Sequence, residues 1–196
     1  MNETLPKIGL FFGSFNPVHV GHMIIANFMV TQTDLKEVWF VVSPHNPLKP
    51  KKSLARDHDR LHLVRLAIGD NLALRASDIE FGLPKPSYTI DTLAYLREKY
   101  PDKQFTLIMG GDNLATLPKW KHHDLILRDY LIYVYKRPDF APAEFADHPH
   151  IRLFDAPQMD ISATYIRRCI REGKSVQYLV TEPVFDYLNN SGLYRK

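Results

Sequence analysis

At 196 residues the chain is long enough for one well-packed domain and short for two. Hydrophobic residues make up 45% of it and charged residues 24%, a balance that excludes wholesale disorder. The formal net charge of +3 is too small to indicate a long nucleic-acid footprint, and it fits a small anionic ligand equally well.

No apolar run approaches the roughly 20 residues that a membrane-spanning helix needs. The first residues, MNETLPK, lack the charged-then-apolar pattern of an export signal. Cys169 is the single cysteine, so an internal disulfide cannot form, and a small buried side chain is its expected role. We therefore expect a cytoplasmic protein with neither a membrane nor a nucleic acid as partner. A homo-oligomer stays open.

Taken in chain order, segments rich in apolar, β-branched or aromatic residues predict strands, and segments with apolar residues on successive turns predict helices. The predicted strands are 7–12, 37–43, 72–81, 105–110, 131–136 and, more weakly, 151–156. The predicted helices between them fall within 21–33, 56–70 and 89–101.

Strands that alternate with helices indicate a parallel sheet covered on both faces, and continuously apolar strands such as VWFVV agree. The proline- and charge-rich segment 137–150 is typical of a surface excursion. Short helices are expected after it at 162–172, 175–180 and 182–190. We predict one α/β domain over residues 1–196, a Rossmann-like, doubly wound parallel sheet with a small helical C-terminal cap from about residue 160.

The first predicted strand runs into a turn of small residues and then into two histidines. This stretch is IGLFFGSFNPVHVGH, and it places His19 and His22 three residues apart. In an open parallel sheet, ligands bind beyond the carboxyl ends of the strands. Small residues followed by a helix N-terminus suit a phosphate group there, and imidazoles could donate hydrogen bonds to its oxygens.

Other interpretations of these histidines stay open. A histidine near a helix start is often a cap, and two histidines three apart could be half of a zinc site, although no second cluster of paired ligands accompanies them. His58 and His62 fit the solvated face of an amphipathic helix. Neither G-x-G-x-x-G nor G-x-x-x-x-G-K-[ST] occurs in the chain. Spacing alone therefore supports phosphate chemistry and a structural role about equally.

A second informative stretch is DISATYIRRCIREG. Ser162 is a natural N-cap for the helix that follows. Thr164 and Arg167 fall near the start of that helix, where hydroxyls, free N–H groups and a guanidinium together could form an anion cradle. A capped helix with surface arginines is the alternative, especially for Arg168 and Arg171.

The two stretches together resemble the nucleotidylyltransferase superfamily, which is marked by (H/T)-x-G-H and S-x-T-x-x-R motifs. GSFNPVHVGH and SATYIR carry these motifs in that order. KPSYTIDTL, GGDNLATLPKW and YKRP narrow the resemblance to the bacterial nicotinate-nucleotide adenylyltransferase family, and the resemblance covers most of the chain. Asn16 stands where many members of the wider superfamily carry Asp.

The resemblance implies transfer of the adenylyl group of ATP to the phosphate of nicotinate mononucleotide, giving deamido-NAD and pyrophosphate. Mg²⁺ would accompany ATP and need few or no protein ligands, so no protein metal site is expected. Two alternatives stay open. One is an adenylyltransferase with another acceptor, nicotinamide mononucleotide or phosphopantetheine, and the other is a non-catalytic nucleotide-binding protein.

The resemblance also implies roles for individual residues. The residues expected to be catalytic, through contacts with the ATP phosphates, are His19, His22 and Arg167. Those expected to bind ATP are Gly13, Ser14, Phe15, Lys49, Asp112, Ser162, Thr164 and Arg167. Those expected to bind the nicotinate nucleotide are Tyr88, Thr89, Trp120 and Arg137. For Lys49, an ordinary surface lysine is about equally well supported.

Overall fold

The computed structural model describes residues 5–44, 54–136, 145 and 147–195. Its centre is a sheet of six parallel strands in the order β3-β2-β1-β4-β5-β6. The strands are β1 (Lys7–Gly13), β2 (Glu37–Val42), β3 (Leu74–Ser77), β4 (Gln104–Gly110), β5 (Leu131–Tyr135) and β6 (Ile151–Phe154). This is the strand order of a doubly wound sheet, so the predicted Rossmann-like fold is confirmed.

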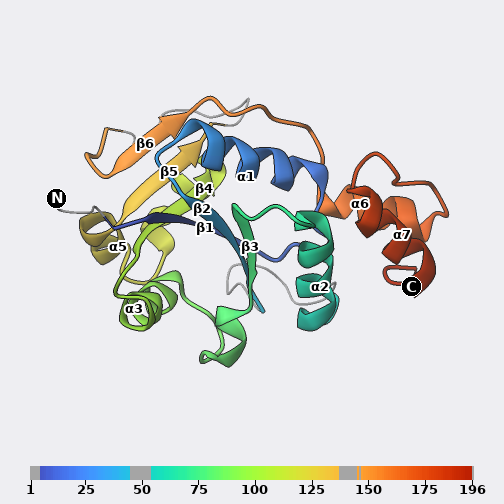
Figure 1. Cartoon of the computed structure of the whole chain (residues 1–196), viewed down its shortest axis with the longest axis horizontal. Coiled ribbons are helices and arrows are strands. Elements are labelled where there is room, and N and C mark those ends of the chain that lie inside the picture. The colour runs from blue at the N-terminus through green and yellow to red at the C-terminus, as the bar shows by residue number, and fades with distance from the viewer. Residues whose placement is uncertain (1–4, 45–53, 137–144, 146, 196) are drawn as a thin grey trace.

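Helices cover both faces of the sheet (Figure 1). The α-helices are α1 (Val20–Gln32), α2 (Asp57–Ile68), α3 (Thr89–Lys99), α4 (Gly111–Leu114), α5 (His123–Asp129), α6 (Ala163–Arg171) and α7 (Glu182–Ser191). Two short 3₁₀ helices are η1 (Ile79–Gly82) and η2 (Leu117–Lys119). The buried apolar residues of α1, α2, α6 and α7 belong to one hydrophobic cluster, and those of α3 and α5 belong to the other.

Strand β2 shows why the strands are continuously apolar. Val38 and Phe40 belong to one cluster, whereas Trp39 and Val41 belong to the other, and all four side chains are at most 1% exposed. Successive side chains of a strand point to opposite faces, so a strand between two layers of helices needs apolar residues at every position. Burying each such side chain stabilises the fold by roughly 1.5–3 kcal/mol.

The structure differs from the prediction at one strand and one helix. The strand expected at 72–81 is shorter, because β3 ends at Ser77 and η1 follows. The helix expected at 175–180 does not form. Val176 and Val180 are buried at helical spacing, but the segment is a turn in which the Leu179 N–H donates to the Val176 carbonyl at 2.9 Å. The Leu179 carbonyl accepts instead from the first N–H of α1, on Val20, at 3.0 Å, so a tertiary contact takes the place of a helix.

The C-terminal cap of α6 and α7 lies at one end of the molecule, beside α2 and the start of α1 (Figure 1). Cys169 is buried, as expected, and shares its hydrophobic cluster with Val184 and Leu188 of α7 and with Leu61 of α2. The predicted excursion at 137–150 lies mostly outside the described residues. Among the described helices, none is long and apolar enough to cross a membrane.

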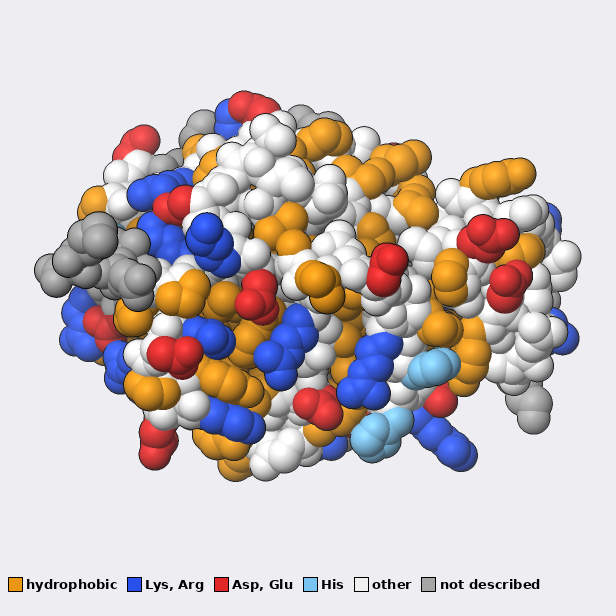
Figure 2. All heavy atoms as spheres, in the orientation of Figure 1, with side chains coloured by type: hydrophobic (Ala, Val, Ile, Leu, Met, Phe, Trp, Pro, Cys, Tyr) orange, Lys and Arg blue, Asp and Glu red, His pale blue; other side chains and the backbone are white. Residues whose placement is uncertain are grey.

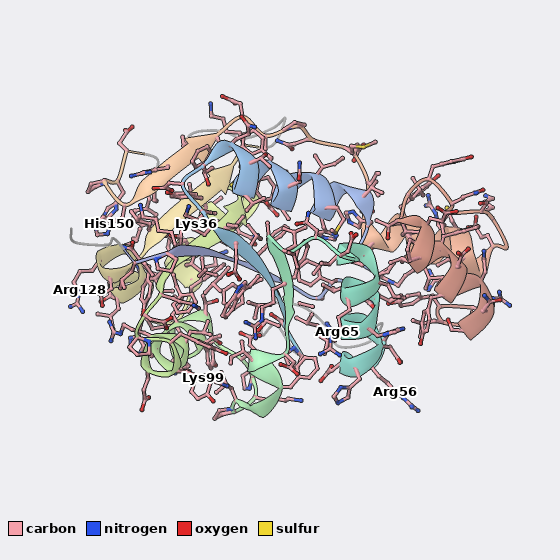
Figure 3. All side chains as sticks on the ribbon, viewed as in Figure 1. Lys36, Arg56, Arg65, Lys99, Arg128 and His150 are labelled. Carbon is pink, nitrogen blue, oxygen red and sulfur yellow. The ribbon has the colours of Figure 1, made fainter. Side chains whose placement is uncertain are left out.

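Positive charge is spread over many elements. Figure 3 labels Lys36 before β2, Arg56 and Arg65 on or beside α2, Lys99 at the end of α3 and Arg128 on α5, so cationic side chains occur on several different elements.

Candidate functional site

Two adjoining cavities lie at the carboxyl edge of the sheet, where the strand order reverses between β1 and β4. The larger, which we call the histidine cavity, has a volume of about 540 Å³, and the smaller, the tryptophan cavity, has about 200 Å³. The described residues that line both are Phe12, Gly13, Ser14 and Asn113. The turn after β1 therefore forms a common wall between the two cavities, which are candidate ligand sites.

In the turn after β1, Gly13 and Ser14 line both cavities, whereas the ring of Phe15 packs into the hydrophobic core. Phe15 adopts a positive φ of 43° and is 2% exposed, and its ring packs against Phe11, Phe40 and His22. A Cβ atom on Gly13 would lie 2.8 Å from the Phe15 ring, which is closer than any real contact. A side chain at position 13 would therefore displace the Phe15 ring from its packing.

A fully buried arginine, Arg60, fixes this turn to its surroundings. Its guanidinium donates to the carbonyls of Ser14, Ser43 and Ala55 and pairs with the carboxylate of Asp57 at 2.8 Å. A buried charge is tolerated only when its hydrogen bonds are satisfied. The sequence pattern missed Arg60, because an arginine on an amphipathic helix is ordinarily a surface residue.

His19 and His22 lie together at the start of α1 and line the histidine cavity. His19 is the N-cap and is 7% exposed, and the two ring centroids are 3.7 Å apart. His22 Nδ1 accepts the backbone N–H of His19 at 3.2 Å. A neutral imidazole that accepts on Nδ1 carries its proton on Nε2, so Nε2 is the donor atom of His22.

Gly21 makes room for this pair. A Cβ atom there would lie 3.1 Å from His19 Nδ1 and 3.3 Å from its Cε1. Gly21 itself also lines the histidine cavity. Its contact in the structure is with the His19 ring, so any larger residue at 21 would displace a histidine first.

Helix α6 supplies the opposite wall of the histidine cavity through Ser162, Thr164 and Arg167. Ser162 caps the helix as predicted, its Oγ accepting the N–H of Tyr165 at 3.2 Å. Arg167 donates from Nη1 to the carbonyl of Asn16 at 2.7 Å and from Nη2 to Thr164 Oγ1 at 3.2 Å. Burial lowers the pKa of Arg167, but an arginine pKa is so far above neutrality that the side chain stays charged.

The polar groups that line the histidine cavity indicate what kind of metal ion could bind there. Asp112, in the first turn of α4 directly after β4, is the one acidic residue among the described residues of this wall. The other polar groups are hydroxyls, amides, imidazoles and a guanidinium. This donor set fits a hard cation that is held mainly by phosphate oxygens and takes few ligands from the protein.

The tryptophan cavity contains the other predicted residues. Tyr88 is the N-cap residue of α3 and Thr89 its first residue, and both line the cavity with Trp120, which follows η2. The Tyr88 side chain does not cap α3, whereas its carbonyl accepts the N–H groups of Asp91 and Thr92 at 3.1 and 3.2 Å. Trp120 Nε1 is buried without a hydrogen-bond partner in the described part of the chain.

Glu80 also lines the tryptophan cavity, and the sequence analysis missed it. Its side chain is 2% exposed, and Oε1 accepts from Thr92 Oγ1 at 2.8 Å. Burial raises the pKa of Glu80, an effect that hydrogen bonds from Thr92 and Ser43 oppose. A glutamate in the short segment between a strand and a helix gives no sign in sequence that it will be buried.

Two lysines flank Trp120 at this cavity, and they too were missed. Lys121 Nζ lies 2.9 and 3.2 Å from the carboxylate oxygens of Asp91 and 4.7 Å from the centre of the Tyr88 ring. Lys119 lines the same wall. The sequence signal was present in Lys-Trp-Lys, since side chains next to a predicted ligand-stacking residue are candidates for the same site.

The structure brings together twelve of the predicted residues at these two cavities. The residues at the cavities are Gly13, Ser14, Phe15, His19, His22, Asp112, Ser162, Thr164, Arg167 and, in the tryptophan cavity, Tyr88, Thr89 and Trp120. Lys49 and Arg137 lie outside the described residues.

The two histidines of α2 are surface residues, as expected from their place on the solvated face of an amphipathic helix. His58 and His62 are exposed, and their rings contact Phe81 and Tyr187 with ring centroids 5.4 and 4.8 Å apart. Figure 2 shows histidine side chains in pale blue on the outer surface at the position of α2. They are not part of either cavity among the described residues.

Known proteins similar to this chain agree with the geometry. Residues 10–169 match the model of the cytidylyltransferase-like family. A probable nicotinate-nucleotide adenylyltransferase of Cytophaga hutchinsonii is 53% identical over 96% of this chain and 98% of its own length. One of Flavobacterium johnsoniae is 50% identical over 97% of this chain and the whole of its own length.

The fold agrees as well. The structure of Plasmodium falciparum nicotinic acid mononucleotide adenylyltransferase complexed with NaAD superposes with a TM-score of 0.82, covering 96% of this chain and 97% of that one at 19% identity. At that identity the likeness shows the fold alone. The relatives at 50% identity and more show the family: the chain is a member of the nicotinate-nucleotide adenylyltransferases.

Proposed function

We propose that the protein transfers the adenylyl group of ATP to nicotinate mononucleotide, giving deamido-NAD and pyrophosphate in NAD biosynthesis. The observation that carries this is the common wall at Gly13 and Ser14. One cavity offers histidines, hydroxyls and an arginine, which suit a triphosphate, and the other offers an aromatic ring and cations, which suit an anionic aromatic. Two ligands placed in them would meet at the turn after β1.

The acceptor in this reaction needs no general base. The phosphate of nicotinate mononucleotide is already an anion, and it forms a bond to the α-phosphorus of ATP while the bond to pyrophosphate breaks. The protein's task is then to hold two mutually repelling polyanions in line and to offset the charge that develops. No covalent intermediate with the protein is required.

The histidine cavity supplies groups for that task. His22 would donate from Nε2 to a phosphate oxygen, and His19 would contact the same triphosphate beside it. Ser162, Thr164 and Arg167, on the opposite wall, would hold the pyrophosphate as it leaves. Mg²⁺ bound with ATP would neutralise phosphate charge, and Asp112 is the carboxylate of this wall that would contact it or a ribose hydroxyl.

The tryptophan cavity would hold the pyridine end of the acceptor. The indole of Trp120 would stack on the ring, and Tyr88 and Thr89 would contact the ring substituent beside the uncapped start of α3. Lys121 and Lys119 give this wall positive charge, which favours a carboxylate over a neutral amide.

Pyrophosphate release from ATP and Mg²⁺ tests this proposal, with nicotinate mononucleotide, nicotinamide mononucleotide or phosphopantetheine as acceptor. We expect fast release with nicotinate mononucleotide and a lower kcat/KM with the other two. Preference for another acceptor would keep the histidine cavity and overturn the assignment of the tryptophan cavity. Absence of release with all three would favour a non-catalytic nucleotide-binding protein.

A further inference from the structure

The C-terminal tail reaches the turn after β1 through a single side chain. Tyr194 follows α7 and adopts a positive φ of 65°, after Gly192 at a φ of 67°. Its hydroxyl donates to Asn16 Oδ1 at 2.7 Å, a contact between residues 178 positions apart. Burial raises the pKa of Tyr194, so its hydroxyl keeps its proton and serves as a donor at physiological pH.

Asn16 receives hydrogen bonds from three separate parts of the chain. Its Oδ1 accepts from the Tyr194 hydroxyl and from the N–H of Ala55 at 3.1 Å, just before α2. Its carbonyl accepts from Arg167 Nη1 at 2.7 Å. Asn16 is 2% exposed, so these contacts are shielded from water and fix its orientation.

Arg167 depends on this arrangement for its own position. Within the described residues, its hydrogen-bond partners are the Asn16 carbonyl and Thr164 Oγ1, and its buried Nε has none. A shift of the Asn16 peptide would therefore move the Arg167 guanidinium relative to the histidine cavity, which both residues line.

We propose that Tyr194 is a positioning residue for adenylyl transfer: its hydroxyl holds Asn16, and Asn16 in turn holds Arg167 at the triphosphate site. Tyr194 itself would not touch substrate. The inference rests on the proposed function of the histidine cavity as the ATP site. It gives the C-terminal cap a part in the reaction besides packing, because the cap carries both Arg167 and the residue that orients it.

Tyr194→Phe tests the proposal, because it removes the hydroxyl and keeps the ring. We expect kcat/KM for ATP to fall roughly three- to tenfold, as for the loss of one buried hydrogen bond. KM for nicotinate mononucleotide should change less than twofold, since the acceptor would lie mainly in the other cavity. The matched control is Tyr187→Phe, a tyrosine of α7 that packs on His62, and it should behave as the wild type.

A purely structural role would give a different result. It would lower the melting temperature of Tyr194→Phe and leave the kinetic constants per folded molecule unchanged, and that outcome would overturn the proposal. The route through Asn16 has its own test. In a protein that already carries Asn16→Ala, adding Tyr194→Phe should lower kcat/KM for ATP little further. Fully additive losses would show that Tyr194 does not act through Asn16.

Affinity for a non-hydrolysable ATP analogue, measured by calorimetry with Mg²⁺, separates this inference from the proposed function. The measurement does not depend on which acceptor the enzyme uses. If the wild type binds the analogue and Tyr194→Phe binds it equally well with unchanged kcat, the inference fails. If the wild type does not bind the analogue, the proposed function of the histidine cavity fails first.

Discussion

His22 accepts the backbone N–H of His19 on its Nδ1 at 3.2 Å, and the two imidazole rings lie 3.7 Å apart. One contact therefore ends the turn after β1, starts α1 and selects the tautomer in which His22 Nε2 is a donor. The same residue pair thus serves the local fold and the proposed chemistry, which is why capping and catalysis could not be separated by spacing alone.

Removing the His22 imidazole should lower turnover strongly and leave the fold in place. We expect His22→Ala to reduce kcat by around 10²-fold, the usual size for losing a donor that stabilises developing charge. The ring is half-buried at the cavity wall, so circular dichroism should be unchanged. His62→Ala, on the exposed side of α2, is the control and should retain full activity. Near-normal turnover in a folded His22→Ala protein would remove His22 from the mechanism.

A methyl group at position 21 should lower the activity of the enzyme without lowering its stability. In Gly21→Ala the new Cβ would lie 3.1 Å from His19 Nδ1, so the His19 ring must shift by a few tenths of an ångström. We expect kcat to fall by roughly tenfold, because small displacements of reacting groups are costly. The melting temperature should not fall, because alanine favours helix over glycine.

Gly82→Ala is the control for this change. A Cβ at Gly82 meets nothing within 4 Å, and both rate and stability should stay close to wild type. Full activity of Gly21→Ala would mean that His19 tolerates displacement and is not held in a required position.

Lys121 should contribute to the choice between nicotinate and nicotinamide. Its ammonium is held by Asp91 and by the Tyr88 ring at the tryptophan cavity. For Lys121→Met we expect kcat/KM for nicotinate mononucleotide to fall about tenfold and that for nicotinamide mononucleotide to change little, since a charged hydrogen bond favours the carboxylate alone.

Lys103→Met is a suitable control for this lysine. Lys103 pairs with Asp102 at 3.2 Å and directly precedes β4, at the amino edge of the sheet and away from both cavities. The ratio of the two kcat/KM values should stay at the wild-type value in that variant. If the ratio of kcat/KM for nicotinate mononucleotide to that for nicotinamide mononucleotide is also unchanged in Lys121→Met, Lys121 does not select the carboxylate, and backbone N–H donors would have to do so.

Much of the fold could be predicted from local patterns, because the period of apolar residues follows from burial. Apart from β3, which is shorter than expected, the strands and the helices α1, α2 and α3 lie where that period placed them. The segment 175–180 was mistaken for a helix because Val176 and Val180 share helical spacing, while a distant N–H determined its backbone path.

The site was predicted less completely, for a related reason. His19, His22 and Arg167 belong to sequence motifs, so they could be identified from the sequence. Arg60 and Tyr194 contact the turn after β1 across many residues of sequence, and nothing local distinguishes them from other arginines and tyrosines. Long-range hydrogen bonds are set by the assembled fold, so only the structure reveals them.

Glu80 should make stability depend on pH in a predictable direction. Burial raises its pKa in the folded protein above the ordinary value of 4.5. Between that value and the higher folded pKa, the folded state holds a proton that the unfolded state has released. The free energy of unfolding therefore falls as pH rises through this window.

Glu80→Gln should remove that contribution, because the amide keeps an acceptor for Thr92 and cannot ionise. Denaturant unfolding between pH 4 and pH 7 should show the variant gaining stability relative to the wild type as pH rises, with the two closest at the acid end. Glu98→Gln, at an exposed position of α3, is the control and should keep a constant difference from the wild type across the range. Parallel curves for Glu80→Gln and the wild type would contradict a raised pKa and would mean that Glu80 is ionised in the folded protein, adding a negative charge to the cavity proposed for nicotinate.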